Sequence, residues 1–177
     1  MKRIAIFIGP LLFMAWTAMA ADIPKSPFAM DPPPGWQVST SGVMGSLIFF
    51  MDAPRDGFAA SINVLKEKVG ETTLDEYVNV SYENLQKSIP DFRLIHKEKT
   101  AINGIPFGAF EYAASQGKLD LHVYQVFAIY KSVAYLFTGA SLEKCAGEYI
   151  PIIKNSLHTI RITAQAGHNH AEAPEDQ

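Results

Sequence analysis

Few residues of this chain have the types and spacing that catalysis requires. Ser141 and Lys144 stand in the S-x-x-K spacing of the nucleophile in penicillin-recognising enzymes. The S-D-N and K-T-G motifs that accompany this nucleophile do not occur in the sequence, and neither does a G-x-S-x-G motif. We therefore prefer the interpretation that Ser141 caps the start of a helix and that Lys144 faces solvent. No catalytic signature remains, and we expect a protein that is not an enzyme.

Histidine and carboxylate side chains gather near the C-terminus. His168 and His170, together with Glu172, Glu175 and Asp176, are of the types that bind Zn²⁺, Cu²⁺ or Ni²⁺. Two histidines without a preformed cage bind such an ion weakly, and residues 164–177 lack apolar periodicity. A disordered acidic tail is therefore the simpler interpretation. Apart from this candidate metal site, the sequence predicts no cofactor.

Glu111 stands alone among apolar neighbours in "GAFEYAA". If it points inward, it needs a partner such as Lys118, His122 or Gln125, and its pKa rises if it has none. The other interpretation places Glu111 at a sheet edge, in a structural role.

Aromatic side chains with polar tips form the second candidate ligand site, because they can line an apolar pocket. A place in the core is the competing interpretation for all of them. The aromatic residues in question are Trp36, Tyr82, Tyr112, Tyr124, Tyr130 and Tyr135. The set that we predict to bind a ligand is Trp36, Glu111, Tyr112, Tyr124 and Tyr135.

The first twenty residues have the organisation of a secretory signal peptide. Lys2 and Arg3 precede an uncharged apolar stretch, Ile4 to Trp16, and Ala18-Met19-Ala20 is an A-x-A cleavage site. An uncleaved membrane anchor is the alternative. We expect cleavage, export to the periplasm and a soluble product with no integral membrane span.

Charge and cysteine content narrow the range of partners. Without the two basic residues of the leader, 13 Lys and Arg face 18 Asp and Glu, a net charge of −5. An acidic chain without a basic cluster is not expected to bind nucleic acid. Cys145 is the single cysteine, so an internal disulfide is excluded, and we expect it to lie in the core.

The N-terminal half is expected to contain one clear helix. Residues 21–34 are rich in proline and should be extended, a tether that docks at its end through Trp36. Thr73 and Glu76 have capping-box spacing, and apolar residues then recur at helical intervals until Pro90, which predicts a helix over Leu74–Ile89. Short strands are expected at Trp36–Thr40, Leu47–Met51 and Ala59–Leu65.

The C-terminal half is expected to be a meander of strands followed by a second helix. The turns lie at Asn103-Gly104, Gln116-Gly117-Lys118 and Lys131-Ser132. A helix should run from about Leu142 to Asn155, and "LHTIRI" could add a short closing strand. The strands of the meander are predicted at 92–100, 107–115, 119–130 and 133–140.

The run "LHVYQVFAIYKSVAYLFTGAS", Leu121 to Ser141, is about as long as a membrane-spanning helix. Lys131 at its middle and its β-branched and aromatic residues favour a hairpin instead. Both parities of its first strand are apolar, so the sheet should be covered on two sides. The two helices are the available covers. The sequence thus predicts an α+β fold, an α/β/α sandwich with a mostly antiparallel sheet, in one domain over 35–163.

The order of these elements resembles the PsbP-like domains, which include the extrinsic subunit of the oxygen-evolving complex and the bacterial periplasmic DcrB-like proteins. The resemblance covers about Pro32 to Ile162. It is carried by "PPPGWQV", "TTLDEYVNVSYENLQKSIPDFRLIHKEKTAINGIPFGAFEY", "LHVYQVFAIYKSVAYLFTGAS" and "YIPIIKNSLHTI".

The resemblance implies a fold and a tendency toward non-enzymatic binding or assembly roles, and it supplies no site residues. We therefore expect an exported binding or assembly factor that contacts an envelope protein, which the sequence does not identify. The alternative is a periplasmic carrier of a small ligand or a metal.

Overall fold

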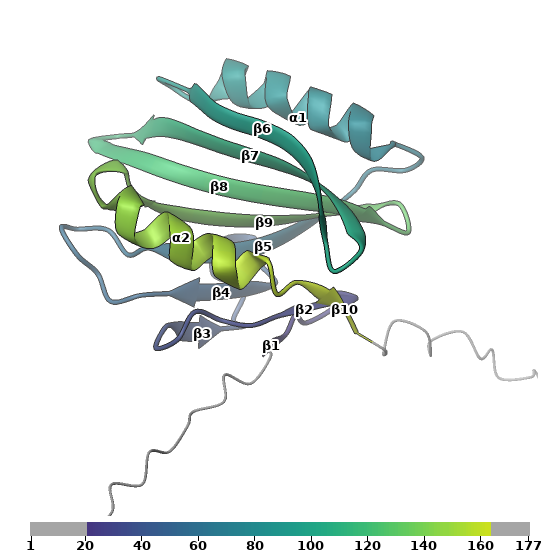
Figure 1. Ribbon diagram of the computed structural model, residues 1–177, viewed down its shortest axis with the longest axis horizontal. Coiled ribbons are helices and arrows are strands. Elements are labelled where there is room, and N and C mark those ends of the chain that lie inside the picture. The colour runs from purple at the N-terminus through teal and green to yellow at the C-terminus, as the bar shows by residue number, and fades with distance from the viewer. Residues whose placement is uncertain (1–20, 164–177) are drawn as a thin grey trace, which may run out of the picture.

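A seven-stranded antiparallel sheet forms the centre of the computed structural model, which describes residues 21–163 (Figure 1). The strand order is β3-β4-β5-β9-β8-β7-β6, and every neighbouring pair is antiparallel. The predicted leader at 1–20 and the tail with His168 and His170 lie outside the described residues. The strands are β3 (Gln37–Ser39), β4 (Ile48–Met51), β5 (Ser61–Lys68), β6 (Arg93–Ile102), β7 (Ile105–Gln116), β8 (Leu119–Tyr130) and β9 (Val133–Leu142).

The run predicted to be a hairpin is a hairpin. Its strands β8 and β9 pair from Tyr130↔Val133 to Leu121↔Leu142. Lys131 and Ser132 have φ values of 48° and 60°. Two successive left-handed residues form the turn whose twist matches that of the flanking strands. No helix within residues 21–163 is long and apolar enough to cross a membrane.

Two helices cover the two faces of the sheet (Figure 1). They are α1 (Leu74–Ser88) and α2 (Ala146–Leu157). The predicted capping box starts α1: the Glu76 N–H donates to the Thr73 hydroxyl at 3.2 Å, and the Thr73 N–H donates to the Glu76 carboxylate at 2.9 Å. Short 3₁₀ turns precede β4 and α2, at η1 (Val43–Gly45) and η2 (Glu143–Cys145).

The second helix begins later than predicted, and Ser141 does not cap it. Ser141 belongs to β9, where it pairs with His122 of β8. The strand continues because this long-range pairing buries Ser141 and Leu142. The preference of an isolated serine for a helix N-terminus is weaker than the burial that pairing provides.

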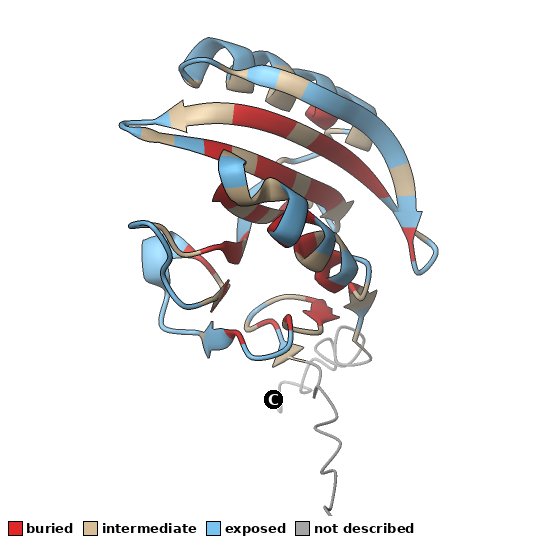
Figure 2. Ribbon diagram, turned by 60° about the vertical axis from the view of Figure 1, so that its left-hand side comes forward, coloured by how far each residue is buried: buried red, intermediate tan, exposed pale blue. Residues whose placement is uncertain are grey.

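The core consists of two clusters, one on each face of the sheet. Leu121, Val123 and Phe127 pack on the α1 side. Tyr124, Val126 and Ala128 pack on the α2 side. The two-sided cover predicted from the parity of β8 is therefore confirmed. Figure 2 shows buried residues following the strands through the middle of the sheet, while the outer surface of α1 is exposed.

The N-terminal segment is not a tether that docks only through Trp36. It forms β1 (Ala21–Asp22) and β2 (Phe28–Met30), which pair with each other in a small second sheet. The other side of β2 pairs with β10 (Arg161–Ile162), the predicted closing strand. Ile23, Phe28 and Met30 are buried in the cluster on the α2 face. Their burial supplies the free energy that holds this proline-rich segment in place.

Candidate functional site

Five charged side chains form a continuous chain between α2 and the sheet, here called the ionic chain. The Lys154 ammonium of α2 donates to one carboxylate oxygen of Glu111 on β7, at 2.6 Å. The other oxygen lies 2.8 Å from Nε2 of His122 on β8, and Nδ1 of His122 lies 2.9 Å from Glu143 of η2. Arg93 of β6 donates to the second oxygen of Glu143 at 3.1 Å. The ionic chain thus joins α2 to the three strands β6, β7 and β8 and to the 3₁₀ turn η2.

The electrostatics of the ionic chain are set by Glu111. Its side chain is 14% exposed, so burial opposes ionisation, but the hydrogen bonds from Lys154 and His122 outweigh it and hold the pKa of Glu111 below its usual value. Both nitrogens of the His122 ring face carboxylate oxygens, so a protonated ring donates at both ends. His122 was one of the three partners predicted for an inward-facing Glu111.

The arrangement of the ionic chain is structural. Within the part of the chain that the structure describes, no group of three or more His, Cys, Asp or Glu side chains is placed to hold a metal ion. Glu111 and Glu143 direct their oxygens at Lys154 and Arg93, which would repel a cation. Lys154 was not among the predicted partners of Glu111, although it occupies a helical position beside the apolar stripe of Ile150, Ile153 and Leu157.

The predicted ligand-binding residues lie in separate places. Tyr124 lies under Lys154, whose ammonium is 4.7 Å from the ring centroid, beside Glu111. Tyr112 is buried on the opposite face of the sheet, where burial raises its pKa to about 12. Trp36 packs against Tyr149 of α2, with 6.2 Å between ring centroids. Only Glu111 and Tyr124 share a site.

The S-x-x-K spacing does not form a nucleophilic pair. Ser141 is fully buried, and its hydroxyl donates to the Leu142 carbonyl oxygen at 3.2 Å. Lys144 lies on the surface, paired with Asp56 at 2.7 Å. A buried hydroxyl whose presumed base points to solvent cannot meet a substrate, so the structure excludes this arrangement.

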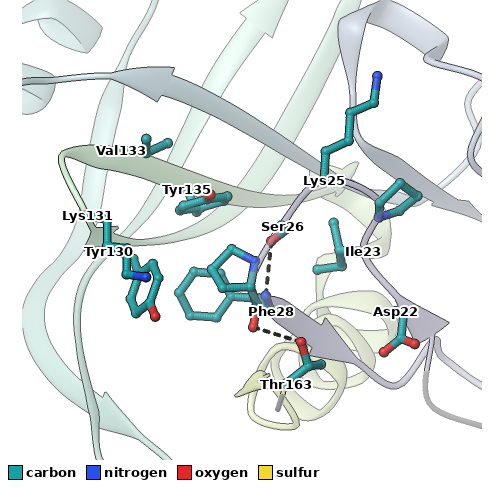
Figure 3. Close-up of a pocket in the computed structure, with 12 residues that line it drawn as sticks. Asp22, Ile23, Lys25, Ser26, Phe28, Tyr130, Lys131, Val133, Tyr135 and Thr163 are labelled. Carbon is teal, nitrogen blue, oxygen red and sulfur yellow. Dashed lines mark hydrogen bonds between the residues drawn. The ribbon is translucent and has the colours of Figure 1, made fainter. Parts of the chain in front are cut away.

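Tyr135 lies at a pocket of about 450 Å³ between the segment 22–28 and the turn that joins β8 to β9 (Figure 3). The rings of Phe28, Tyr130 and Tyr135 form its aromatic side. The ring centroid of Phe28 lies 5.0 Å from that of Tyr135 and 6.1 Å from that of Tyr130, and both tyrosine rings are edge-on to Phe28. Burial, with a contribution from Tyr130, raises the pKa of Tyr135, so its hydroxyl remains a donor. Tyr135 is thus a predicted ligand-binding residue that lines a pocket.

The two edges of the large sheet differ in charge. Five of the ten residues of β6, at one edge, are charged or histidine: Arg93, His96, Lys97, Glu98 and Lys99. The other edge, β3, belongs to Pro32–Met51, a stretch of twenty residues without Asp, Glu, Lys, Arg or His. Here Val38, Val43 and Met44 are 49%, 40% and 80% exposed. We call β3, η1 and β4 the neutral hairpin.

The sequence matches no protein-family model and no curated protein. Solved structures do match. Cyanobacterial PsbP (CyanoP) from Synechocystis sp. PCC 6803 superposes with a TM-score of 0.62 at 16% identity, over 82% of this chain and 92% of that one.

LpqN of Mycobacterium tuberculosis, a protein involved in cell envelope biogenesis, has a TM-score of 0.66 at 12% identity, over 77% and 83% of the two chains. Protein PA94 of Pseudomonas aeruginosa, a protein of unknown function, superposes with a TM-score of 0.58 at 19% identity, over 80% of this chain and 94% of that one. At these identities the likeness concerns the fold. The chain has the PsbP-like α+β fold that the sequence predicted.

Proposed function

We propose that this protein is an exported, non-enzymatic binding or assembly factor of the cell envelope, which acts in the periplasm through protein–protein contacts. Two facts support a location in the cell envelope. The organisation of residues 1–20 is that of a signal peptide, and a protein of the same fold, LpqN, is involved in cell envelope biogenesis. The observation that carries the proposal is the exposed neutral hairpin at one edge of the sheet.

An edge strand offers unpaired backbone groups to other chains, and proteins commonly protect such edges with charged side chains. Strand β6 has that protection. The neutral hairpin lacks it and exposes Val38, Val43 and Met44. These features suit an extended, mainly apolar segment of an envelope protein that adds a strand beside β3, with backbone hydrogen bonds supplying affinity and side chains supplying selectivity.

Site-specific photo-cross-linking in the periplasm tests this proposal. A photoreactive residue in place of Met44 is expected to yield one discrete adduct with another envelope protein. The matched control is Ile95 on β6, an apolar residue that is 42% exposed at the opposite edge, and it should yield none. Equal labelling from both positions would contradict the proposal, as would an adduct consisting only of a second copy of this chain or of lipid.

Substitution of the hairpin gives the quantitative test. Val38→Lys places a charge on the exposed edge and should lower the yield of the cross-linked complex about tenfold, because an unpaired charge would be buried against an apolar partner. Ile95→Lys at the other edge should leave the yield unchanged. Both variants alter exposed positions, so their unfolding midpoints should match that of the original chain, which separates loss of binding from loss of folding.

A further inference from the structure

The pocket beside Tyr135 has the size of a ligand site. Its volume, about 450 Å³, is within the range of about 300–1,000 Å³ that is usual for small-molecule sites. The rings of Tyr130 and Tyr135 supply an apolar side, and the buried ring of Phe28 packs against both, as Figure 3 shows. Within residues 21–163, the hydroxyls of Tyr130 and Tyr135 have no hydrogen-bond partner, so both are available to a bound molecule.

Two lysines line this pocket, and two more lie beside it on the neighbouring strand. Lys25 and Lys131 line it, and the Lys131 ammonium lies 5.4 Å from the centroid of the Tyr130 ring. Two more come from β5, where Lys66 is paired with Tyr135 and Lys68 with Val133 across the β5–β9 ladder. Residues directly opposite one another in an antiparallel pair project from the same face, with Cβ atoms about 5 Å apart. Lys66 also donates to the Lys25 carbonyl oxygen at 2.8 Å.

The four lysines are a local exception in an acidic protein. The whole chain has a formal net charge of −3, and Asp22 is the one acidic residue that lines the pocket. Among the described residues, none of the four lysines takes part in an ion pair, whereas Lys87, Lys99, Lys144 and Lys154 all do. Positive charge that is concentrated around a concave surface raises the local concentration of anions.

We propose that this pocket binds a small anion that carries a planar aromatic ring. The ring packs against Tyr130 and Tyr135, and the acidic group, a carboxylate, sulfonate or phosphate, lies toward Lys131, which lines the pocket, and Lys66 at its rim. Aromatic pairs favour edge-to-face and offset contacts, and the rings of Tyr130 and Tyr135, each edge-on to Phe28, can offer such contacts to a flat ligand. The site is far along the sheet from the ionic chain and does not depend on the neutral hairpin or its partner.

Isothermal titration of the exported full chain with two probes of equal shape tests the charge requirement. The probes are 1-naphthoate and its neutral analogue 1-naphthamide. We expect 1-naphthoate to bind at one site and 1-naphthamide to bind about tenfold more weakly, since it lacks the charge that the lysines attract. The affinity for 1-naphthoate should fall as NaCl rises, because salt screens exposed charges. Equal binding of the two probes would overturn the proposal.

Paired variants locate the site. Lys66→Gln combined with Lys131→Gln should weaken the binding of 1-naphthoate about tenfold. Lys118→Gln is the matched control, an exposed lysine in the turn at the other end of β8 that forms no ion pair among the described residues. Tyr135→Phe should weaken binding several-fold, whereas Tyr112→Phe should not. These two tyrosines are 6% and 5% exposed, so the pair separates loss of a ligand contact from a change in packing.

A competition experiment with lipid vesicles distinguishes a soluble ligand from a lipid surface. Vesicles of phosphatidylglycerol and phosphatidylcholine offer the same negative charge without an aromatic ring. The proposal predicts that 1-naphthoate binds and that these vesicles do not compete for it. If the vesicles bind through Lys66 and Lys131 while 1-naphthoate does not bind at all, the surface serves anionic lipid and the proposal is wrong.

Discussion

The two helices cover opposite faces of the same sheet, but they are attached to it in different ways. Helix α2 buries five residues: Tyr149, Ile150, Ile153, Ser156 and Leu157. Helix α1 buries two, Tyr77 and Val78. Lys154 and Glu111, whose side chains are 35% and 14% exposed, form an ion pair between α2 and the sheet. The ion pair between α1 and the sheet is Lys99–Asp75, in which both side chains are 62% exposed.

Each helix nevertheless uses the same packing device, an aliphatic side chain that rests on a glycine of the sheet. Ile153 of α2 lies over Gly139 of β9, and Val78 of α1 lies over Gly108 of β7. The comparison shows that α2 is part of the core, whereas α1 is an outer cover that depends more on its own local interactions. The following experiments test that difference, in order of decreasing effect on stability.

Removal of the partly buried carboxylate of Glu111 should have the largest effect. Glu111→Ala leaves Lys154 and His122 without their common partner, and we expect a loss of about 3 kcal/mol in the free energy of unfolding. The corresponding change on the α1 side, Asp75→Ala, should alter it by less than about 0.5 kcal/mol, because an exposed pair contributes little. Urea denaturation measures both. Similar values for the two variants would show that the helices are attached equally.

The addition of a methyl group at Gly139 or Gly108 should have the next largest effect on stability. A Cβ at Gly139 would lie within 2.1 Å of Ile153 Cγ2, and one at Gly108 would lie 2.5 Å from Phe127 and 2.6 Å from Val78. We expect Gly139→Ala to destabilise the protein by about 2 kcal/mol and Gly108→Ala by less.

Gly147, in α2, is the control for these two glycines. It is exposed and has no atom within 4 Å of an added Cβ, so Gly147→Ala should stabilise the protein by up to about 1 kcal/mol. A larger loss at Gly108 than at Gly139 would reverse the comparison between the helices.

Acid should remove part of the attachment of α2. The pKa of Glu111 is held below its ordinary value of 4.5, so this residue contributes stability above that pH, and the contribution is lost as the pH falls through its lowered pKa. The difference in unfolding free energy between the original chain and Glu111→Gln should therefore be greatest near pH 6 and shrink below pH 4.5. A difference that stays constant down to pH 3 would contradict this account.

Loss of the capping box should have a smaller effect than the loss of Glu111 or the filling of Gly139. Thr73→Ala removes the side chain that accepts from the Glu76 N–H, which should lower stability by about 1 kcal/mol. Amide hydrogen exchange should show faster exchange in the first turn of α1 and no change in α2. Faster exchange throughout the core would mean that α1 is more than an outer cover.

Much of the fold was predictable because its signals are local. The capping box at Thr73, the turn at Lys131-Ser132 and the two-sided apolar pattern of β8 each occupy a short stretch of sequence, and each is confirmed. The start of α2 was not predictable from such signals. Ser141 has the local preference of a helix cap, but pairing with His122 on β8 places it in a strand.

The candidate sites were predictable only in part. Glu111 was recognised as unusual and His122 as one of its partners, but Lys154 is 43 residues away from Glu111 in sequence. Tyr135 was recognised as a candidate ligand contact without its surroundings. Lys25, Lys66 and Lys131 come from a loop, a strand and a turn, and each alone is an ordinary surface lysine.

The sequence by itself determined the antiparallel α+β fold and the two-sided cover of the sheet, because periodicity, capping and turn preferences act over a few residues. Tertiary structure alone decided which charges meet. It joined Lys154 to Glu111, packed the proline-rich segment against the core and brought Lys66 and Lys131 to the same pocket region as Tyr135. Such contacts depend on which strands become neighbours, and strand order is a property of the whole chain.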